Sequence, residues 1–384
     1  MINSSIDMGS TYIRVDLDHL EDNFKAIQSH CPSSEVMPIL KADAYGHGMH
    51  TCAKYYERWG AASFGVATIE EAIALRQHGI KIPILALGGI LTSQILHYLE
   101  YDVDICVSSI DKLKAVVDHA KAFGRKARIH LKIDTGMERI GIHYYSAEKL
   151  LQESLKHSDS IEVVGIYSHL ADSEFNPKFT SLQLERFLEV LYFYEKNSLP
   201  CPKRHISNSG AILNHPEANL DLVRPGLILY GVDPIGLEKL PFQLKPSLSW
   251  FSKVVYFKVV KPGATVSYGC TWEAKEQTRI ITVPVGYGDG YPRNLSNTAD
   301  VLIRGKRYPI AGRVCMDQFM VDIGPEGEAY NADEVVLIGK QGDEEISIME
   351  LAKMIDTDPR EILLLTHLRC TREYFYKNER VDAI

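Results

Sequence analysis

The chain lacks several features that mark whole classes of protein. Its seven cysteines are scattered and form no CxxC pair, so neither a disulfide framework nor a zinc site is indicated. No apolar run reaches the ~18 residues of a membrane span. Residues 1–8 lack the basic and apolar regions of a secretory signal. The 42 basic and 50 acidic residues give a net charge of −8, without a basic block. We therefore expect no metal, no nucleic acid, no membrane partner and a cytoplasmic location.

The composition is that of an ordinary enzyme, and the length of 384 residues suggests more than one domain. Helical patterns such as 110–123, which Gly124 ends, and 69–78, which follows a capping box at Thr68, fill most gaps between short apolar runs. Eight such runs alternating with helices predict a closed (β/α)8 barrel of the TIM type, with a doubly wound sheet as the alternative. The runs are 36–41, 64–67, 83–87, 104–108, 128–133, 162–168, 204–208 and 222–229.

The pattern changes near residue 240, where 237–246 has the composition of a linker. Alternating or β-branched runs follow at 248–260, 279–285, 300–303 and 334–338, separated by glycine and proline turns. We predict a barrel domain over 12–242 and a mainly β domain over 243–384. Residues 1–11 can join the second domain, and the strand-like run 11–17 belongs to it or to the junction.

Lys41 stands where an apolar, strand-like run breaks into the small residues and glycines of 42–48. A lysine at the end of a buried strand is costly unless its nitrogen is used. Burial lowers the pKa of lysine and exposes a neutral amine, which can form a Schiff base with a carbonyl compound. The alternative is a lysine whose long side chain simply reaches solvent.

Reactive side chains recur where the barrel strands end, which is the catalytic face of such barrels. They include Lys41, Lys132, His169 and Arg224. The loops after the last two strands carry Ser209 and Gly226, and a hydroxyl beside backbone amides suits a phosphate dianion. A lysine and a phosphate site on one face suggest pyridoxal phosphate (PLP). Asn208 and Ser209 would equally suit a helix N-cap.

These segments resemble the alanine racemases, which are PLP enzymes of fold type III. The resemblance spans nearly the whole chain, with the segments in family order. They are Lys41-Ala-Asp-Ala-Tyr-Gly-His-Gly48, Lys132, Asp134-Thr-Gly-Met137, Arg139, Ser168-His169, Ser207-Asn-Ser209, Arg224-Pro-Gly226, Tyr230-Gly231, Ser267-Tyr-Gly269, Gly286-Tyr-Gly-Asp-Gly290 and Gly312-Arg-Val-Cys-Met-Asp-Gln318.

The resemblance implies a homodimer that interconverts L- and D-alanine with two bases and supplies D-alanine for peptidoglycan. Lys41 would hold PLP and act on one face of the substrate, and Tyr268 of the partner subunit would act on the other. The other residues it implies for cofactor binding are Tyr45, Arg139, His169, Asn208, Ser209, Arg224, Gly226 and Leu227. Arg139, Tyr287 and Met316 would contact the substrate. Lys132 matches a position that is carbamylated in some members.

One position departs from the family pattern. Leu368 stands where many relatives have a tyrosine that narrows the entrance, so a more polar substrate such as serine is an alternative. A fold type III decarboxylase is a further alternative, although its triple-glycine loop and cysteine motif are not found. His47 and His50 have the spacing of metal ligands, but no third ligand is near.

Overall fold

The computed structural model describes residues 10–236, 240–366 and 369–384, which form two compact units. The barrel unit contains residues 20–44 and 48–245, with Ile384. The β unit contains the described residues up to His19, residues 45–47 and the described part of 246–383. The limits 12–242 and 243–384 read from the sequence stay a prediction. Each unit is described by itself.

Eight parallel strands follow one another around the barrel unit in sequence order, which confirms the predicted barrel and excludes a doubly wound sheet. Six form one sheet, and the last strand pairs with the first. Two backbone hydrogen bonds link this pair of strands to the six-stranded sheet and so close the ring. The Leu40 amide donates to the Gly65 carbonyl, and the Arg224 amide donates to the Ser207 carbonyl. The strands are β2 (Glu35–Val36), β3 (Phe64–Val66), β4 (Ile84–Ala86), β5 (Asp104–Val107), β6 (Ala127–Asp134), β8 (Ile161–Tyr167), β9 (Lys203–His205) and β10 (Leu222–Val223).

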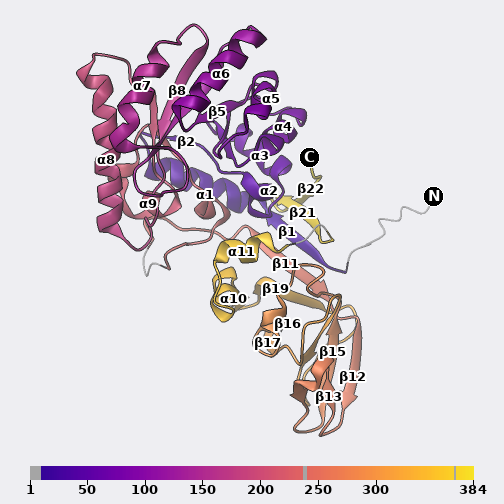
Figure 1. Ribbon diagram of the computed structural model, residues 1–384. Helices are drawn as coiled ribbons and strands as arrows, with labels where there is room; N and C mark the ends of the chain where they lie inside the picture. The colour runs from indigo at the N-terminus through magenta and orange to yellow at the C-terminus, as the bar shows by residue number, and fades with distance from the viewer. Residues whose placement is uncertain (1–9, 237–239, 367–368) are drawn as a thin grey trace, which may run out of the picture. The chain divides into compact units, whose positions relative to one another are not determined.

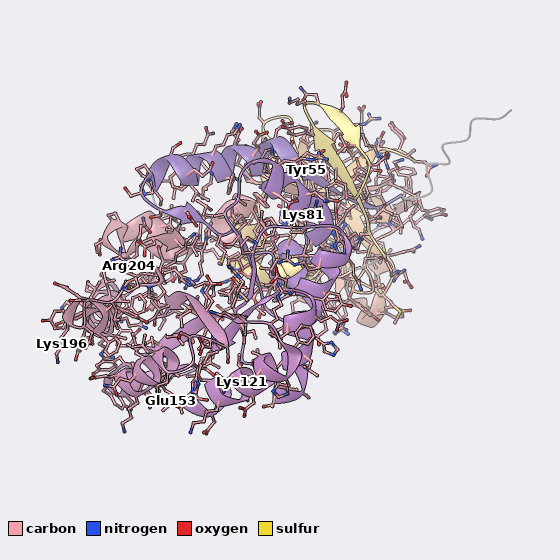
Figure 2. The ribbon with its side chains drawn as sticks, turned by 90° about the horizontal axis from the view of Figure 1, so that it is seen from above. Tyr55, Lys81, Lys121, Glu153, Lys196 and Arg204 are labelled. Atoms are coloured by element: carbon pink, nitrogen blue, oxygen red, sulfur yellow. The ribbon has the colours of Figure 1, made fainter. Side chains whose placement is uncertain are left out.

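Helices surround these strands (Figure 1). The capping box predicted at Thr68 is present, and Gly124 ends α6 in the left-handed conformation. Lys121 on α6 and Lys196 at the end of α8 lie exposed on the outer surface (Figure 2). The helices are α1 (Leu17–His30), α3 (Met49–Arg58), α4 (Ile69–Gln77), α5 (Ile95–Glu100), α6 (Ile110–Phe123), α7 (Ala147–Leu155), α8 (Pro177–Lys196) and α9 (Ser209–Asn214).

The β unit is built on a mixed sheet whose strand order is β17-β16-β19-β11-β1-β21-β22, with β20 paired to β19. A second sheet has the order β12-β15-β18, and β13 pairs with β14. Two short helices, α10 (Ile348–Met354) and α11 (Pro359–Leu364), complete the unit. The strands are β1 (Tyr12–Asp16), β11 (Leu248–Lys253), β12 (Tyr256–Val260), β13 (Thr265–Val266), β14 (Trp272–Glu273), β15 (Thr278–Val283), β16 (Asp300–Ile303), β17 (Lys306–Pro309), β18 (Phe319–Asp322), β19 (Glu334–Gln341), β20 (Glu344–Ile346), β21 (Thr371–Tyr376) and β22 (Glu379–Val381).

The run 248–260 that the sequence shows as one stretch is divided between the two sheets. β11 pairs with β1 and β19, whereas β12 pairs with β15. The change occurs at Val254 and Val255, whose amides donate to Asp333 and Thr282 respectively. β1 joins β11 antiparallel and β21 parallel, so the first strand of the chain lies in the sheet built by its second half. None of the helices among the described residues has the length and apolarity needed to cross a membrane.

Candidate active site

Lys41 is half-buried and opens a short left-handed helical turn, α2 (Lys41–Tyr45). From Ala42 to Ala44 the φ angles are 53–55° and the ψ angles 44–55°. Left-handed residues other than glycine cost about 1–2 kcal/mol each, so such a turn needs support from its surroundings. The predicted strand of 36–41 is correspondingly short: β2 ends at Val36, and the extended chain reaches Lys41 through a single bridge between Ile39 and Gly65.

The support comes from two carboxylates of the barrel unit. Glu71 Oε1 accepts a hydrogen bond from the Ala42 amide at 2.7 Å, and its Oε2 accepts from the Ala67 amide at 2.7 Å. Asp43 Oδ1 accepts from the Met49 amide at 2.7 Å. The sequence around Glu71 indicates only its part in the capping box with Thr68. Its second contact lies 29 residues away in the chain and leaves no local signal.

Arg224 lies buried just after β10 and is held by acceptors around its guanidinium group. One terminal nitrogen faces His205 Nδ1 at 3.0 Å. The other donates to the carbonyl oxygens of Ser168 at 2.8 Å and Ile206 at 3.1 Å, and faces His169 Nδ1 at 3.4 Å. Burial lowers the pKa of Arg224 to about 10, so it stays charged at neutral pH. Among the described residues Arg224 has no ion-pair partner.

Lys132 is buried on β6, with its ammonium nitrogen 4.6 Å from the centre of the Tyr167 ring. Burial, followed by the positive charge of Arg224, lowers the pKa of Lys132 to about 7. Cys106 and Asp134 oppose this shift, and Arg139 adds to it. Lys132 therefore presents a neutral amine for about half of the time at neutral pH.

Asp134 shapes the loop that carries Arg139. Its Oδ1 accepts hydrogen bonds from the amides of Gly136, Met137 and Glu138 at 2.8, 3.0 and 3.2 Å. Arg139 itself lies exposed after this turn. The turn thus places the guanidinium group of Arg139 beyond the end of β6.

His169 follows β8 and is neutral at physiological pH. Burial and then the charges of Arg224, Lys132, Arg139 and Lys41 hold the pKa of His169 well below its usual value. Arginine can only donate, so His169 Nδ1 must accept from Arg224, and the ring proton sits on Nε2. The barrel unit therefore gathers two arginines and two lysines near one neutral histidine.

The predicted phosphate loops come together at the same end of the strands. Ser209 is buried, and its Oγ accepts a hydrogen bond from the Gly226 amide at 3.0 Å. Gly226 precedes a 3-10 turn that begins at Leu227. Asn208 is the N-cap of α9, since its Oδ1 accepts from the Ala211 amide at 3.0 Å and from Ser173 Oγ at 2.6 Å. The N-cap interpretation therefore holds for Asn208.

Three residues predicted for the site lie on one exposed face of the β unit. Tyr268, Tyr287 and Met316 are 73%, 45% and 53% exposed. The segment 313–316 joins them: Ser267 Oγ donates to the Arg313 carbonyl at 2.5 Å, and the Tyr287 amide donates to the Cys315 carbonyl at 3.1 Å. Apolar side chains grouped at a surface are typical of an interaction site.

The turn that presents Tyr268 is strained. Ser267 has φ 67° and ψ −179°, a conformation that is almost confined to glycine, and Gly269 and Cys270 also have positive φ. The Ser267 hydroxyl, anchored on Arg313, holds this turn in place. Strain of this kind gathers at functional sites, so the backbone conformation supports a functional role for Tyr268.

Tyr45 and Leu368 are the two remaining positions that the family resemblance singles out. Tyr45 belongs to the β unit, and burial raises its pKa to about 12, so its hydroxyl remains a hydrogen-bond donor. Leu368 lies outside the described residues. The residues gathered within the barrel unit are Lys41, Lys132, Arg139, His169, Asn208, Ser209, Arg224, Gly226 and Leu227, and those within the β unit are Tyr45, Tyr268, Tyr287 and Met316.

The barrel-unit residues fit a phosphorylated aldehyde. Lys41 offers an amine at the start of the left-handed turn, and Ser209 offers a hydroxyl proton because its oxygen accepts from the Gly226 amide. Arg224 offers a buried cation that has no carboxylate partner among the described residues. An excess of buried positive charge favours an anionic ligand. The donor set therefore suits PLP.

Known proteins share both units of this chain. A family model described as "Alanine racemase, N-terminal domain" matches residues 15–234, and "Alanine racemase, C-terminal domain" matches 247–374. An alanine racemase of Methanococcus maripaludis is 38% identical over 371 residues, covering 95% of this chain and 98% of that protein.

Two solved structures extend the comparison. The alanine racemase of Clostridium difficile 630 superposes with a TM-score of 0.91 at 32% identity, covering 98% of both chains. A histidine racemase from Leuconostoc mesenteroides subsp. sake has a TM-score of 0.87 at 28% identity, covering 97% of this chain and 100% of that one. Barrel, β unit and site thus define an amino-acid racemase, an isomerase. The chain belongs to the alanine racemase family.

Proposed function

We propose that the protein interconverts L- and D-alanine with PLP as cofactor and with two bases, Lys41 and the Tyr268 of a partner subunit. The observation that carries the proposal is the arrangement at the catalytic end of the barrel, where Lys41 opens a left-handed turn, Arg224 is held buried by carbonyl oxygens and Ser209 meets the Gly226 amide. Bound PLP supplies an electron sink that makes the Cα proton of an amino acid acidic. The chain's own residues then decide which protons move.

Inversion needs an acid/base group on each face of the substrate carbon. Lys41, on its left-handed turn, serves one face, and Tyr268 serves the other. A phenol with an unperturbed pKa of about 10 is a weak base at neutral pH. Because His169 Nδ1 accepts from Arg224, the ring proton of His169 lies on Nε2. This proton is suited to stabilise a tyrosinate by donating a hydrogen bond to it.

Arg224 would face the pyridine nitrogen of a bound cofactor and would keep that nitrogen unprotonated, because arginine does not release its proton. A cofactor held in this way would be a weaker electron sink, and side reactions such as transamination would be limited. Ser209, Gly226, Leu227 and Tyr45 would hold the phosphate, and Asn208 would belong to the cofactor-binding residues. Arg139, with Tyr287 and Met316 of the partner, would hold the substrate.

The exposed face around Tyr268 supports a homodimer with shared sites. Mixing inactive Lys41→Ala and Tyr268→Phe proteins tests this arrangement. Exchange of subunits should restore activity, because some sites then contain both native bases. Activity that stays absent after proven exchange would show that each site uses the two bases of one chain.

Lys132 has the properties of a carbamylation site. Its neutral amine can attack carbon dioxide, forming an N–C bond while one C=O π bond opens and the amine proton passes to solvent. The charges of Arg224 and Arg139, which disfavour an ammonium group, would stabilise the resulting anion. Incubation with 13C-bicarbonate should give a carbamate signal in the 13C NMR spectrum that Lys132→Met lacks.

The second candidate is racemisation of another amino acid, which the similarity to a histidine racemase favours. Serine belongs to this alternative because of the departure at Leu368. A panel of L-amino acids, assayed by chiral chromatography with a parallel assay of carbon dioxide release, separates the candidates. Turnover of alanine above all others supports the proposal. Release of carbon dioxide would contradict it and indicate a decarboxylase.

We also infer the biological setting from family resemblance and from the cysteines. All seven are free, which fits the reducing cytoplasm. A bacterium that needs D-alanine for peptidoglycan would depend on the enzyme. Rescue of a D-alanine auxotroph by the wild-type gene, and not by a Lys41→Ala variant, is the expected result.

A further inference from the structure

A row of buried polar side chains crosses the barrel interior behind Arg224. A terminal nitrogen of Arg224 faces His205 Nδ1 at 3.0 Å, and His205 Nε2 faces His130 Nδ1 at 2.9 Å. His130 Nε2 faces Asp104 Oδ2 at 3.4 Å. All four side chains are buried, and none of the three behind Arg224 was expected to belong to the site.

The donors and acceptors of these groups allow hydrogen bonds to be donated along the row in only one direction, from Arg224 to Asp104. Arginine has only donors, so His205 Nδ1 must accept, and the ring proton of His205 lies on Nε2. That proton is donated to His130 Nδ1, which places the ring proton of His130 on Nε2, where it faces the Asp104 carboxylate. Burial, together with the charge of Arg224, holds the pKa of His205 well below its usual value, so the ring is neutral as this direction requires.

The surrounding strands leave room for the side chains of the row. Gly165 lies on β8, between the strands that carry His130 and His205, and a Cβ atom at this position would lie 2.1 Å from His130 Nδ1. The ladder between β6 and β8 shifts register at Ile129 and His130. The rings of Tyr167 and His205 stack, with their centroids 4.8 Å apart and an interplanar angle of 7°.

The row begins at the opposite end of the barrel from the site. Asp104 is the first residue of β5, whereas Arg224 follows the end of β10. Arg128 binds Asp104 through Nε at 2.7 Å and a terminal nitrogen at 3.3 Å. Burial alone would raise the pKa of Asp104, but hydrogen bonds from His130 and Arg128 outweigh it and keep the carboxylate ionised. Asp104, Arg128 and His130 line a cavity of about 320 Å³ at this end.

We propose that Asp104, His130 and His205 are positioning residues for Arg224. The carboxylate fixes the tautomer of His130, His130 fixes that of His205, and His205 then offers a lone pair that holds the guanidinium group. A hydrogen-bonded row of this kind also polarises its members toward the buried cation. The inference rests on the proposed function, because it gives the row its purpose of holding Arg224 toward the cofactor.

The test combines tautomers with kinetics. In the cofactor-free protein labelled with 15N-histidine, long-range 15N–1H spectra at pH 8 should show His130 and His205 with the proton on Nε2. His130→Gln and His205→Gln assign the signals. Asp104→Ala should give His130 a mixture of tautomers. In the loaded enzyme it should lower kcat about tenfold, equivalent to 1.4 kcal/mol, with KM within about twofold.

Asp104→Asn is the conservative variant, since its amide oxygen still accepts from His130 and should restore the single tautomer and most of kcat. Asp333→Ala is the matched control: Asp333 binds Arg304 through the same two guanidinium nitrogens, at 3.0 and 3.3 Å, with no histidine in the pair. It should leave both histidine signals and kcat unchanged.

Nδ1-protonated His130 or His205 in the wild-type protein would overturn the inference, even if no variant folds. Unaltered tautomers in Asp104→Ala would overturn it as well. The spectra require no turnover, so a protein with the expected tautomers and no racemase activity would refute the proposed function alone.

Discussion

Lys132 allows a quantitative test of how the barrel treats a buried cation. Its pKa lies at about 7 in the folded protein, against 10.5 for a free lysine side chain. This lowering corresponds to about 5 kcal/mol of native-state penalty for the protonated form. In buffer free of carbon dioxide, where no carbamate forms, this penalty should appear in the stability of the protein.

The sign follows from proton binding. Between pH 7 and about 10.5 the unfolded chain keeps a proton on Lys132 that the folded protein has released, so stability rises with pH. From pH 7 to pH 9 the contribution of Lys132 to the free energy of unfolding should increase by about 2 kcal/mol. Below about pH 6 both states are protonated, and the penalty becomes constant.

The assay is urea unfolding followed by tryptophan fluorescence at pH 7, 8 and 9, for the wild type and for Lys132→Met. The difference in free energy between the two proteins should shift by about 2 kcal/mol in favour of the wild type as the pH rises. Lys196→Met, at an exposed lysine of α8, is the control and should stay parallel to the wild type (Figure 2). Parallel curves for Lys132→Met would refute the assignment of a lowered pKa to Lys132.

Three other substitutions test the site. Arg224→Glu should lower racemisation and raise transamination, because a carboxylate can keep the pyridine nitrogen protonated; formation of pyridoxamine phosphate no faster than in the wild type would contradict this. Glu71→Gln replaces one accepting oxygen at the Lys41 turn by a donating amide group, so the turn should lose about 1–2 kcal/mol of stabilisation. Cofactor binding should then weaken about tenfold in fluorescence titrations, whereas the control Glu70→Gln should bind the cofactor as the wild type does. Leu368→Tyr should sharpen the preference for alanine, and an unchanged alanine-to-serine ratio of kcat/KM would count against that expectation.

The Lys41 turn shows where prediction from the sequence ends. The break after an apolar run, with its small residues and glycines, was enough to indicate a strand end and a turn. The left-handed conformation of Ala42, Asp43 and Ala44 was not predictable, since alanine disfavours it and aspartate adopts it only occasionally and as a single residue. Its support comes from Glu71, whose local pattern indicates only a helix cap.

The second half of the chain shows a similar division. Alternation and turn residues correctly predicted a mainly β region. They did not predict that 248–260 would divide between two sheets or that β1 would pair with β11 and β21, because strand pairing depends on partners far away in the sequence. The exposure that groups Tyr268 with Tyr287 and Met316 likewise became visible only in the folded β unit.

The sequence by itself determined the barrel, the lysine at the end of its first strand and the family, since periodicity and short motifs are local properties of the chain. Only the tertiary structure decided the environment of the charges. Asp104, His130, His205 and Arg224 come from four strands or strand ends, and nothing in their spacing indicates a row. Their tautomers and the lowered pKa of Lys132 arise from burial and from neighbours distant in the sequence, which folding alone brings within hydrogen-bond distance.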